Sequence, residues 1–201
     1  MIKQAIAKVI RGENLNMDEI EAAMGEVFDG HASSAQTSTL VTALRLKGES
    51  IDEITGAAKA LRSRAQKLEL GNHLLAVDRD DINVEGETIL ETSDTGNQGT
   101  STFNISTATI FVVAAGGIRV ARHGSRASSM YFGAADVLAN LGVNLDLSFS
   151  DVERCIQEVG IGFLFTPLMH GPMRNVARLR EEMGIRTIVN LIGPLTNPAG
   201  A

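Results

Sequence analysis

The first seventy residues carry apolar side chains every three or four positions, which is the spacing of one face of an α-helix. Ile6, Val9 and Ile10 form the first stripe. Two later stripes follow an Asn or Ser with a Glu three residues on, a pair that caps the free N–H groups at a helix start. These pairs are Asn16 with Glu19 and Ser50 with Glu53. With a further helix over residues 34–46, the pattern predicts a small helical domain over residues 1–70.

After Gly71 the pattern changes to short apolar strands that alternate with helices. The strands are expected at residues 86–94, 118–124 and 161–167, and the helices at 102–117, 128–142, 148–160 and 173–183. Such alternation predicts a parallel sheet, and so an α/β domain over residues 71–201. Three strands are few for such a sheet. We therefore expect the sheet to be incomplete in this chain, with the C-terminal part of the domain missing.

Composition and charge narrow the class of protein. Hydrophobic residues make up 44% of the 201 residues and charged residues 21%, which is typical of a folded protein. The net charge of -6 disfavours nucleic-acid binding. Cys155 is the only cysteine, so no internal disulfide can form, and a reducing compartment is expected. The sequence has no apolar stretch of membrane-spanning length, so we expect a cytoplasmic protein.

A glycine-rich stretch, DTGNQGTSTFNIST, joins the first expected strand to the next helix over residues 94–107. Gly96 and Gly99 allow the backbone to approach a ligand closely, and several hydroxyl groups stand at the helix N-terminus, where the helix dipole favours an anion. The stretch is thus typical of a phosphate-binding loop. A tight turn from strand to helix would have the same composition, so both interpretations stay open.

A cationic cluster follows the second expected strand, in RVARHGSR. Arg122 and Arg126 would suit a pyrophosphate, although a solvated basic loop is an equal alternative. The flanking arginines disfavour a protonated His123, which is therefore expected to act as a neutral hydrogen-bonding group. In a parallel sheet, ligands bind beyond the carboxyl ends of the strands, so we expect this cluster and the glycine-rich stretch to lie on one rim.

The third strand end, FTPLMHGP, adds His170 to that rim, and Arg180 on the following helix could reach a carboxylate. The alternative is that His170 only enters the helix and that the arginines form a solvated face. Cys155 is expected in the core. The sequence has no CxxC or HExxH spacing for a metal and no GxSxG elbow for a nucleophilic serine.

Three stretches together resemble anthranilate phosphoribosyltransferase, a family of tryptophan biosynthesis. They are TSTFNIST, RHGSR with the following FGAADVLANLG, and FLFTPLMHGPMRNVARLREEMGIRTIVNLIGPLTNP. The resemblance implies a helical N-terminal domain and an α/β domain of the nucleoside phosphorylase and phosphoribosyltransferase type. It also implies a homodimer that transfers the phosphoribosyl group of phosphoribosyl pyrophosphate to the amine of anthranilate. Mg²⁺ would neutralise the pyrophosphate that is released.

The same resemblance implies the site residues. Those expected to bind phosphoribosyl pyrophosphate are Thr95, Gly96, Asn97, Gln98, Gly99, Thr102, Asn104, Ser106, Thr107, Arg122 and Ser129, and Ser106 is also the expected magnesium ligand. Those expected to bind anthranilate are His123, Gly124, Ser125, His170 and Arg180. No residue is assigned as a catalytic acid or base, and neither a membrane nor nucleic acid is expected as a partner.

This chain departs from the family's pattern at the glycine-rich loop. The family has GTGGDG where this chain has DTGNQG, so Asp94, Asn97 and Gln98 stand at altered positions. Ser125 replaces the family's asparagine, and Ala134 replaces a serine near phosphate. An Asp-Glu pair that holds magnesium in the family lies beyond Ala201. Two alternatives therefore stay open: a non-catalytic relative that binds an anionic ligand or a protein, and a transferase of the same fold with another nitrogen acceptor.

Overall fold

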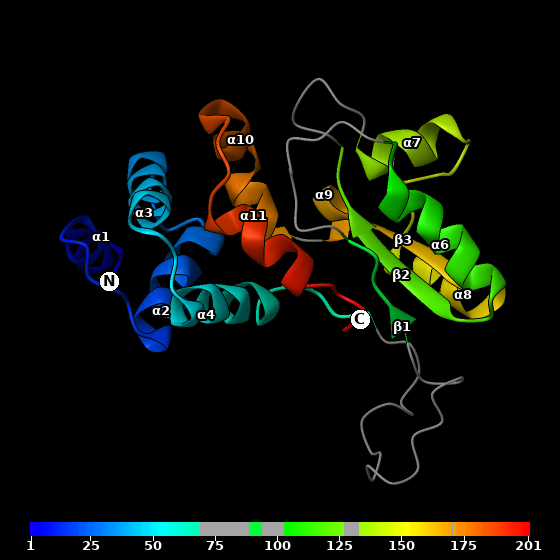
Figure 1. Ribbon diagram of the computed structural model, residues 1–201, viewed down its shortest axis with the longest axis horizontal. Coiled ribbons are helices and arrows are strands. Elements are labelled where there is room, and N and C mark those ends of the chain that lie inside the picture. Colours follow the sequence, from blue (N-terminus) through cyan, green and yellow to red (C-terminus); the bar gives the residue numbers. More distant parts are fainter. Residues whose placement is uncertain (69–88, 94–102, 127–132, 170) are drawn as a thin grey trace, which may run out of the picture. The chain divides into compact units, whose positions relative to one another are not determined.

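The computed structural model of the chain describes residues 1–68, 89–93, 103–126, 133–169 and 171–201 (Figure 1). These residues form two compact units. A helical unit contains residues 1–65 and 171–196, and a sheet unit contains residues 66–68, 89–93, 103–126, 133–169 and 197–201.

The helical unit is built from six α-helices among its described residues. They are α1 (Ile2–Ile10), α2 (Met17–Phe28), α3 (Ser34–Lys47), α4 (Ile51–Arg62), α10 (Arg174–Met183) and α11 (Ile188–Ile192), with short 3₁₀ turns at Gly171–Met173 and Gly193–Leu195. Their apolar faces meet in one core, in which Ile20, Leu40 and Ile188 are fully buried. The unit therefore draws its stability from burial between helices that lie far apart in the sequence.

Capping boxes fix where three of these helices begin. Asn16 accepts a hydrogen bond from the backbone N–H of Glu19, and Ser50 does the same for Glu53, as the sequence predicts. The helix starts expected at these positions are confirmed. A third box at the start of α3, made by Ser33 and Gln36, uses the same chemistry with a glutamine in place of the glutamate.

The sheet unit contains three parallel strands in the order β1 (Ile89–Leu90), β2 (Arg119–Gly124), β3 (Ile161–Phe165). Helices α6 (Ile105–Ala115) and α7 (Ala134–Asn140) pack on one face, and α8 (Phe149–Val159) packs on the other (Figure 1). Successive strand residues alternate between the two faces. Val120 therefore lies in the core beneath α6, whereas Ala121 lies in the core beneath α8.

Gly162 on β3 lets α8 approach the sheet closely. A Cβ atom at this position would lie 2.4 Å from Cγ1 of Ile156 and 2.9 Å from Cγ1 of Val152. Both of these side chains are fully buried, so neither can move aside without disturbing the core.

The structure differs from the expected elements at several boundaries. Residues 91–93 were expected in the first strand but lie beyond its two-residue ladder, and residues 86–88 and 94 are outside the described residues. The third strand ends at Phe165, because Thr166 begins the short helix α9 (Thr166–Met169), which accommodates Pro167 in its first turn. Ser148 caps α8, because its side chain accepts a hydrogen bond from the backbone N–H of Asp151.

The compact units do not follow the order of the sequence, because residues 171–196 belong with the N-terminal helices. The domain boundary expected between residues 70 and 71 remains a prediction. Among the described residues, no helix combines the length and the apolar character that crossing a bilayer would require.

Candidate functional site

The carboxyl ends of β1 and β2 bring polar and charged side chains together in the sheet unit. Glu91 and Ser93 follow β1, and Arg122 and His123 are among the last residues of β2. Neighbouring parallel strands end at the same edge of a sheet, so residues about 30 positions apart in sequence become adjacent. This edge is the rim on which the sequence predicts ligand binding.

Glu91 is the centre of this group. Its Oε1 atom accepts hydrogen bonds from Nη1 of Arg122 at 3.0 Å and from Oγ of Ser93 at 2.8 Å. Its Oε2 atom accepts from the backbone N–H of His123 at 3.0 Å and from Nδ2 of Asn197. The carboxylate thus has two donors on each oxygen, which satisfies a charged group whose side chain is only 10% exposed.

Arg122 is buried beside this carboxylate, with its side chain 7% exposed. Besides Glu91, its Nη1 atom donates to the carbonyl oxygen of His123 at 2.8 Å and to Oγ of Ser93. Its Nε atom is buried and has no hydrogen-bond partner among the described residues. A buried donor without an acceptor is costly, so this position suits an acceptor supplied by a ligand.

His123 links the same group to the end of β3. Its Nε2 atom lies 3.1 Å from Oγ1 of Thr166, the first residue of α9, and its backbone N–H and carbonyl bind Glu91 and Arg122. The side chain is buried, in keeping with the expected hydrogen-bonding role. Thr166 therefore helps to fix the ring, and the sequence did not single it out.

The residues after His123 turn outward. Ser125 is exposed, and the guanidinium of Arg126 lies 6.0 Å from the centre of the Phe165 ring while its Nη1 contacts Asp136 at 3.1 Å. Gly124 lies against Phe163, whose ring would be 3.2 Å from an added Cβ atom. A side chain at position 124 would therefore press on the core.

The start of α6 lies next to β1. Oγ1 of Thr92 donates to the carbonyl oxygen of Ser106 at 3.0 Å, and Oγ1 of buried Thr107 donates to Oδ1 of Asn104 at 2.8 Å. Asn104 is the N-cap residue, but its side chain does not cap a backbone N–H. The helix N-terminus, which favours an anion, is thus tied to Thr92, the neighbour in sequence of the Ser93 that contacts Arg122.

Several expected site residues fall outside the described residues, so the structure says nothing of them. They are Thr95, Gly96, Asn97, Gln98, Gly99, Thr102, Ser129 and His170. Of the others, Asn104, Ser106, Thr107, Arg122, His123, Gly124 and Ser125 all belong to the sheet unit. Their assigned roles remain predictions.

Arg180 belongs to the helical unit, on α10. Burial lowers the pKa of its guanidinium, against the opposing effect of neighbouring Glu181. Its Nε atom is buried and has no hydrogen-bond partner in the part of the chain that the structure describes. By contrast, Arg178 on the same helix is 90% exposed and paired with Glu182 at 2.7 Å. The solvated-face alternative therefore describes Arg178 but not Arg180.

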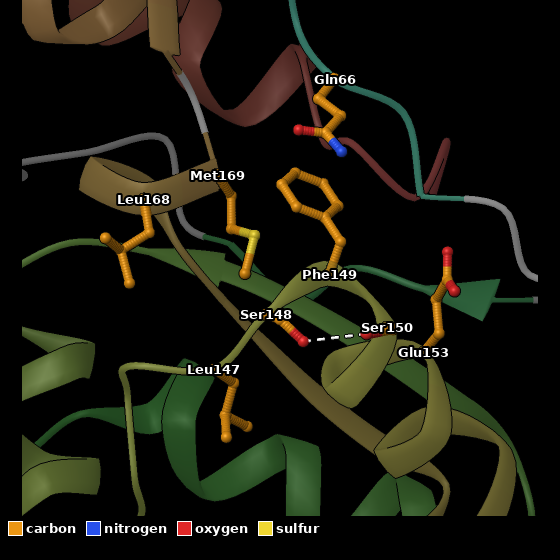
Figure 2. Close-up of a pocket in the computed structure, with 8 residues that line it drawn as sticks. All are labelled: Gln66, Leu147, Ser148, Phe149, Ser150, Glu153, Leu168 and Met169. Carbon is orange, nitrogen blue, oxygen red and sulfur yellow. Dashed lines mark hydrogen bonds between the residues drawn. The ribbon is translucent and has the colours of Figure 1, made fainter.

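An open pocket of about 590 Å³ lies elsewhere in the sheet unit, around the start of α8 and the end of α9 (Figure 2). Its lining residues are Gln66, Leu147, Ser148, Phe149, Ser150, Glu153, Leu168 and Met169. None of the predicted site residues lines it. Ser148 and Ser150 instead bind each other at 2.9 Å, so their hydroxyl groups serve the start of the helix.

Sequence reasoning missed Glu91, Ser93 and Asn197. Asn197 lies 106 positions from Glu91, and its Nδ2 also donates to the carbonyl oxygen of Ala121 at 2.7 Å. The one available signal was the LTNP motif near the C-terminal end, which has no role that the sequence alone reveals. Glu91 carried no signal, because a single carboxylate after a strand is common in any sheet.

Two domains of one known family match the chain. The a/b domain of the Glycosyl transferase family matches residues 86–201, and the helical bundle domain of the same family matches residues 3–65. The chain belongs to this glycosyl transferase family. Its predicted fold class, a helical N-terminal part and a parallel α/β part, is thereby confirmed.

Within this family the chain is similar to anthranilate phosphoribosyltransferases, as the quoted motifs predict. It is 53% identical over 201 residues to the enzymes of Pelobacter propionicus and Geotalea uraniireducens. These matches cover 100% of this chain and 57% of each relative. The chain thus spans a little over half the length of these relatives.

Solved structures give the same result. The crystal structure of anthranilate phosphoribosyltransferase from Thermus thermophilus matches with a TM-score of 0.84 and 40% identity, over 98% of this chain and 56% of that one. The enzyme from Saccharomyces cerevisiae in complex with PRPP and Mg matches with a TM-score of 0.81 and 24% identity, over 98% and 55%. The second likeness concerns the fold alone.

Proposed function

We propose that the protein is an anthranilate phosphoribosyltransferase, which transfers the phosphoribosyl group of phosphoribosyl pyrophosphate to the amine of anthranilate and releases pyrophosphate. The observation that carries the proposal is the buried guanidinium of Arg122, which lies near the carboxyl end of β2 and whose Nε finds no partner within the described residues. The 53% identity to enzymes of this name supports it.

The chemistry of this transfer suits the groups present. A bond from the anomeric carbon to pyrophosphate breaks while a bond to the amine nitrogen forms, so negative charge gathers on the leaving group. Fixed donors and a cation stabilise that charge, and no covalent step on the protein is needed. Arg122 and the N-terminus of α6 with Asn104, Ser106 and Thr107 would contribute this stabilisation.

Mg²⁺ is the proposed cofactor, and the Saccharomyces cerevisiae enzyme is described in complex with PRPP and Mg. Among the described residues, no three His, Cys, Asp or Glu side chains gather to hold a metal. The described residues therefore fit an ion that is held mainly by the phosphates of the substrate. The half-buried hydroxyl of Ser106 would supply one further ligand. When bound, the ion would neutralise charge on the pyrophosphate.

For anthranilate, the proposed contacts are His123, Gly124, Ser125, His170 and Arg180. Arg180 would bind the carboxylate, because no described residue offers an acceptor to its buried Nε and an anionic ligand would supply one. We also propose a homodimer in the cytoplasm, as the family resemblance implies.

The test is turnover by the purified full-length gene product. With anthranilate, phosphoribosyl pyrophosphate and Mg²⁺, we expect anthranilate to disappear as pyrophosphate is released in equal amount. Arg122→Ala should abolish turnover, whereas Arg178→Ala, a change of an exposed arginine, should leave it unchanged. Absence of turnover in the unaltered protein would overturn the proposal.

A second candidate is a non-catalytic relative that binds an anionic ligand or a protein. The observation that favours it is the altered loop, in which Asp94, Asn97 and Gln98 replace residues of the family's GTGGDG pattern. The same assay separates the two, because this candidate predicts binding of phosphoribosyl pyrophosphate without release of pyrophosphate. Turnover with another nitrogen nucleophile would instead favour a third candidate, a transferase of the same fold with a different nitrogen acceptor, for which Ser125 and Ala134 are the support.

A further inference from the structure

Glu91 raises a question that the proposed function leaves open. A carboxylate that is only 10% exposed stands beside the arginine expected to meet a phosphate. On charge alone, Glu91 would weaken the binding of any anion there. Its presence at this edge of the sheet therefore requires another explanation.

The hydrogen bonds of Arg122 supply that explanation. All those it makes among the described residues come from Nη1, which is directed at Glu91, Ser93 and the carbonyl of His123. Nε has no partner. In a guanidinium, Nε and Nη2 form the side-on fork that takes two oxygens of one oxyanion. The protein thus holds one edge of Arg122 and leaves the fork to a ligand.

Asn197 holds Glu91 in turn. Its Nδ2 donates to Oε2 of Glu91 and to the carbonyl of Ala121 on β2, while its Oδ1 accepts from the backbone N–H of Ala199 at 2.8 Å. The amide is buried and satisfied at both ends. Glu91 is thereby tied to β2 on one side and to the LTNP motif on the other, which fixes the direction of its carboxylate.

We infer that Glu91, held by Asn197, is a positioning residue that fixes the Nη1 edge of Arg122 and so presents its Nε–Nη2 fork to an oxyanion. The inference rests on the proposed function for the identity of that oxyanion, a pyrophosphate or phosphate group of the substrate. The LTNP motif would then support the anion site through the hydrogen bond from Asn197 to Glu91, without contacting the ligand.

The test depends on whether Glu91→Gln strengthens or weakens the binding of an anion. Glu91→Gln removes a negative charge next to the anion site but keeps the size of the side chain. If Glu91 only neutralised Arg122, this change would tighten anion binding. If Glu91 positions Arg122, binding weakens, and we expect a loss of about tenfold, the lower end of what metal sites lose when a group that orients a ligand is removed.

The probe is inorganic pyrophosphate, titrated into the 201-residue chain by calorimetry, with the melting temperature measured for each variant. Glu53→Gln is the matched control, because Glu53 is also a buried carboxylate paired with a cation, Lys47, at 2.8 Å in the helical unit. It should lower the melting temperature and leave the pyrophosphate affinity unchanged. Ser93→Ala removes one hydrogen bond to Arg122 and should weaken pyrophosphate binding by about threefold. It serves as the test variant if Glu91→Gln does not fold.

Each outcome decides the inference. Weaker binding by Glu91→Gln, or by Ser93→Ala if that variant alone folds, supports it. Unchanged or tighter binding of pyrophosphate by the tested variant overturns it. A failure of the unaltered chain to bind pyrophosphate also overturns it. If pyrophosphate binds and Glu91→Gln weakens it, but the full-length protein shows no transfer to anthranilate, then the inference stands and the proposed function fails.

Discussion

At the scale of single residues, the surroundings of Arg180 suit the binding of a ligand better than they stabilise the folded protein. Its Nε is buried without a partner among the residues that the structure describes, and burial lowers the pKa of the guanidinium because the charged form loses its water. Folding an arginine into such a place costs free energy that no contact within the described residues offsets through Nε. A carboxylate ligand would offset it.

Arg180→Met should therefore raise the free energy of unfolding by about 1 kcal/mol, because it removes the unpaired buried donor and keeps much of the length of the side chain. The same change should weaken anthranilate binding. Chemical denaturation measures the first effect, and titration with anthranilate in the presence of phosphoribosyl pyrophosphate measures the second.

Arg178→Met is the control on the same helix, since Arg178 is 90% exposed and its pair with Glu182 is a surface ion pair. It should change the stability by a few tenths of a kcal/mol at most, with no effect on anthranilate. If Arg180→Met destabilised the protein and left anthranilate binding intact, Arg180 would be a structural residue.

The sequence predicted Arg122 and His123 as members of a site, because charged residues after a strand of a parallel sheet are placed by the topology alone. It could not predict Glu91 and Asn197. Their hydrogen bond joins positions 106 residues apart, and neither position has a periodicity or spacing that reveals its partner. Such long-range polar pairs depend on the packed fold and become visible only in the structure.

At the scale of elements, the contact between α8 and β3 depends on Gly162. Gly162→Ala should lower the free energy of unfolding by about 2 kcal/mol, because the new Cβ would lie 2.4 Å from Ile156 and the buried core cannot yield. Urea denaturation of the 201-residue chain measures the effect. Gly193→Ala is the control, since nothing lies within 4 Å of its added Cβ, and a similar loss there would refute this explanation.

The start of α4 predicts a dependence on pH. Burial raises the pKa of Glu53, but hydrogen bonds from Lys47 and from the backbone N–H groups of Ser50 and Leu15 outweigh it, so the pKa lies below its usual value. Ionised Glu53 therefore stabilises the folded state fully at neutral pH. This stabilisation is lost as the pH falls below about 4.3, the ordinary pKa of a glutamate.

We expect the melting temperature of the unaltered chain to fall more steeply between about pH 5 and pH 3 than that of Glu53→Gln. Other carboxylates with lowered pKa values, such as Glu19 beside Lys8, contribute equally to both proteins. Glu13→Gln, which removes an exposed carboxylate paired with Arg11, should retain the steep fall. Parallel curves for Glu53→Gln and the unaltered chain would contradict the assignment.

Elements with local signals were predicted best. The capping pairs at Asn16 and Ser50 placed two helix starts correctly, since the chemistry of a cap lies within four residues. Strand ends were predicted less well. The end of β3 at Phe165 depends on Thr166 entering a helical turn and binding His123, which the apolar run up to Pro167 does not reveal.

At the scale of the whole molecule, α6 presents an unusual amount of apolar surface for a folded chain. Phe111 is 44% exposed, Val112 is 74% exposed and Ile105 is 55% exposed, whereas Ile110 between them is fully buried. Apolar side chains on both sides of a helix are typical of one covered on both sides. Exposed apolar clusters of this kind favour association.

Val112→Asp should therefore reduce the concentration-dependent association of the 201-residue chain, measured by sedimentation at several concentrations. Ala108→Asp on the same helix adds the same charge at an exposed position but removes little apolar surface, so it should reduce association less. Equal effects of the two changes would mean that charge, and not the apolar face of α6, controls association.

The grouping of residues 171–196 with the N-terminal helices is the feature of the whole molecule that the sequence did not predict. Val176 and Ile188 are buried with Leu40 and Leu61 in one core, although more than 100 positions separate them. Helical periodicity predicts which face of α10 is apolar, but not which of several apolar faces will cover it. The overall class, helices together with a parallel sheet, followed from the pattern alone.

The central claim is that the edge of the sheet around Arg122 is the pyrophosphate site of a phosphoribosyltransferase. The most direct test is calorimetric titration of the 201-residue chain with phosphoribosyl pyrophosphate, with and without Mg²⁺. We expect saturable binding at one site that is tighter with Mg²⁺ and is lost in Arg122→Ala. No binding, or equal binding by Arg122→Ala, would contradict the account.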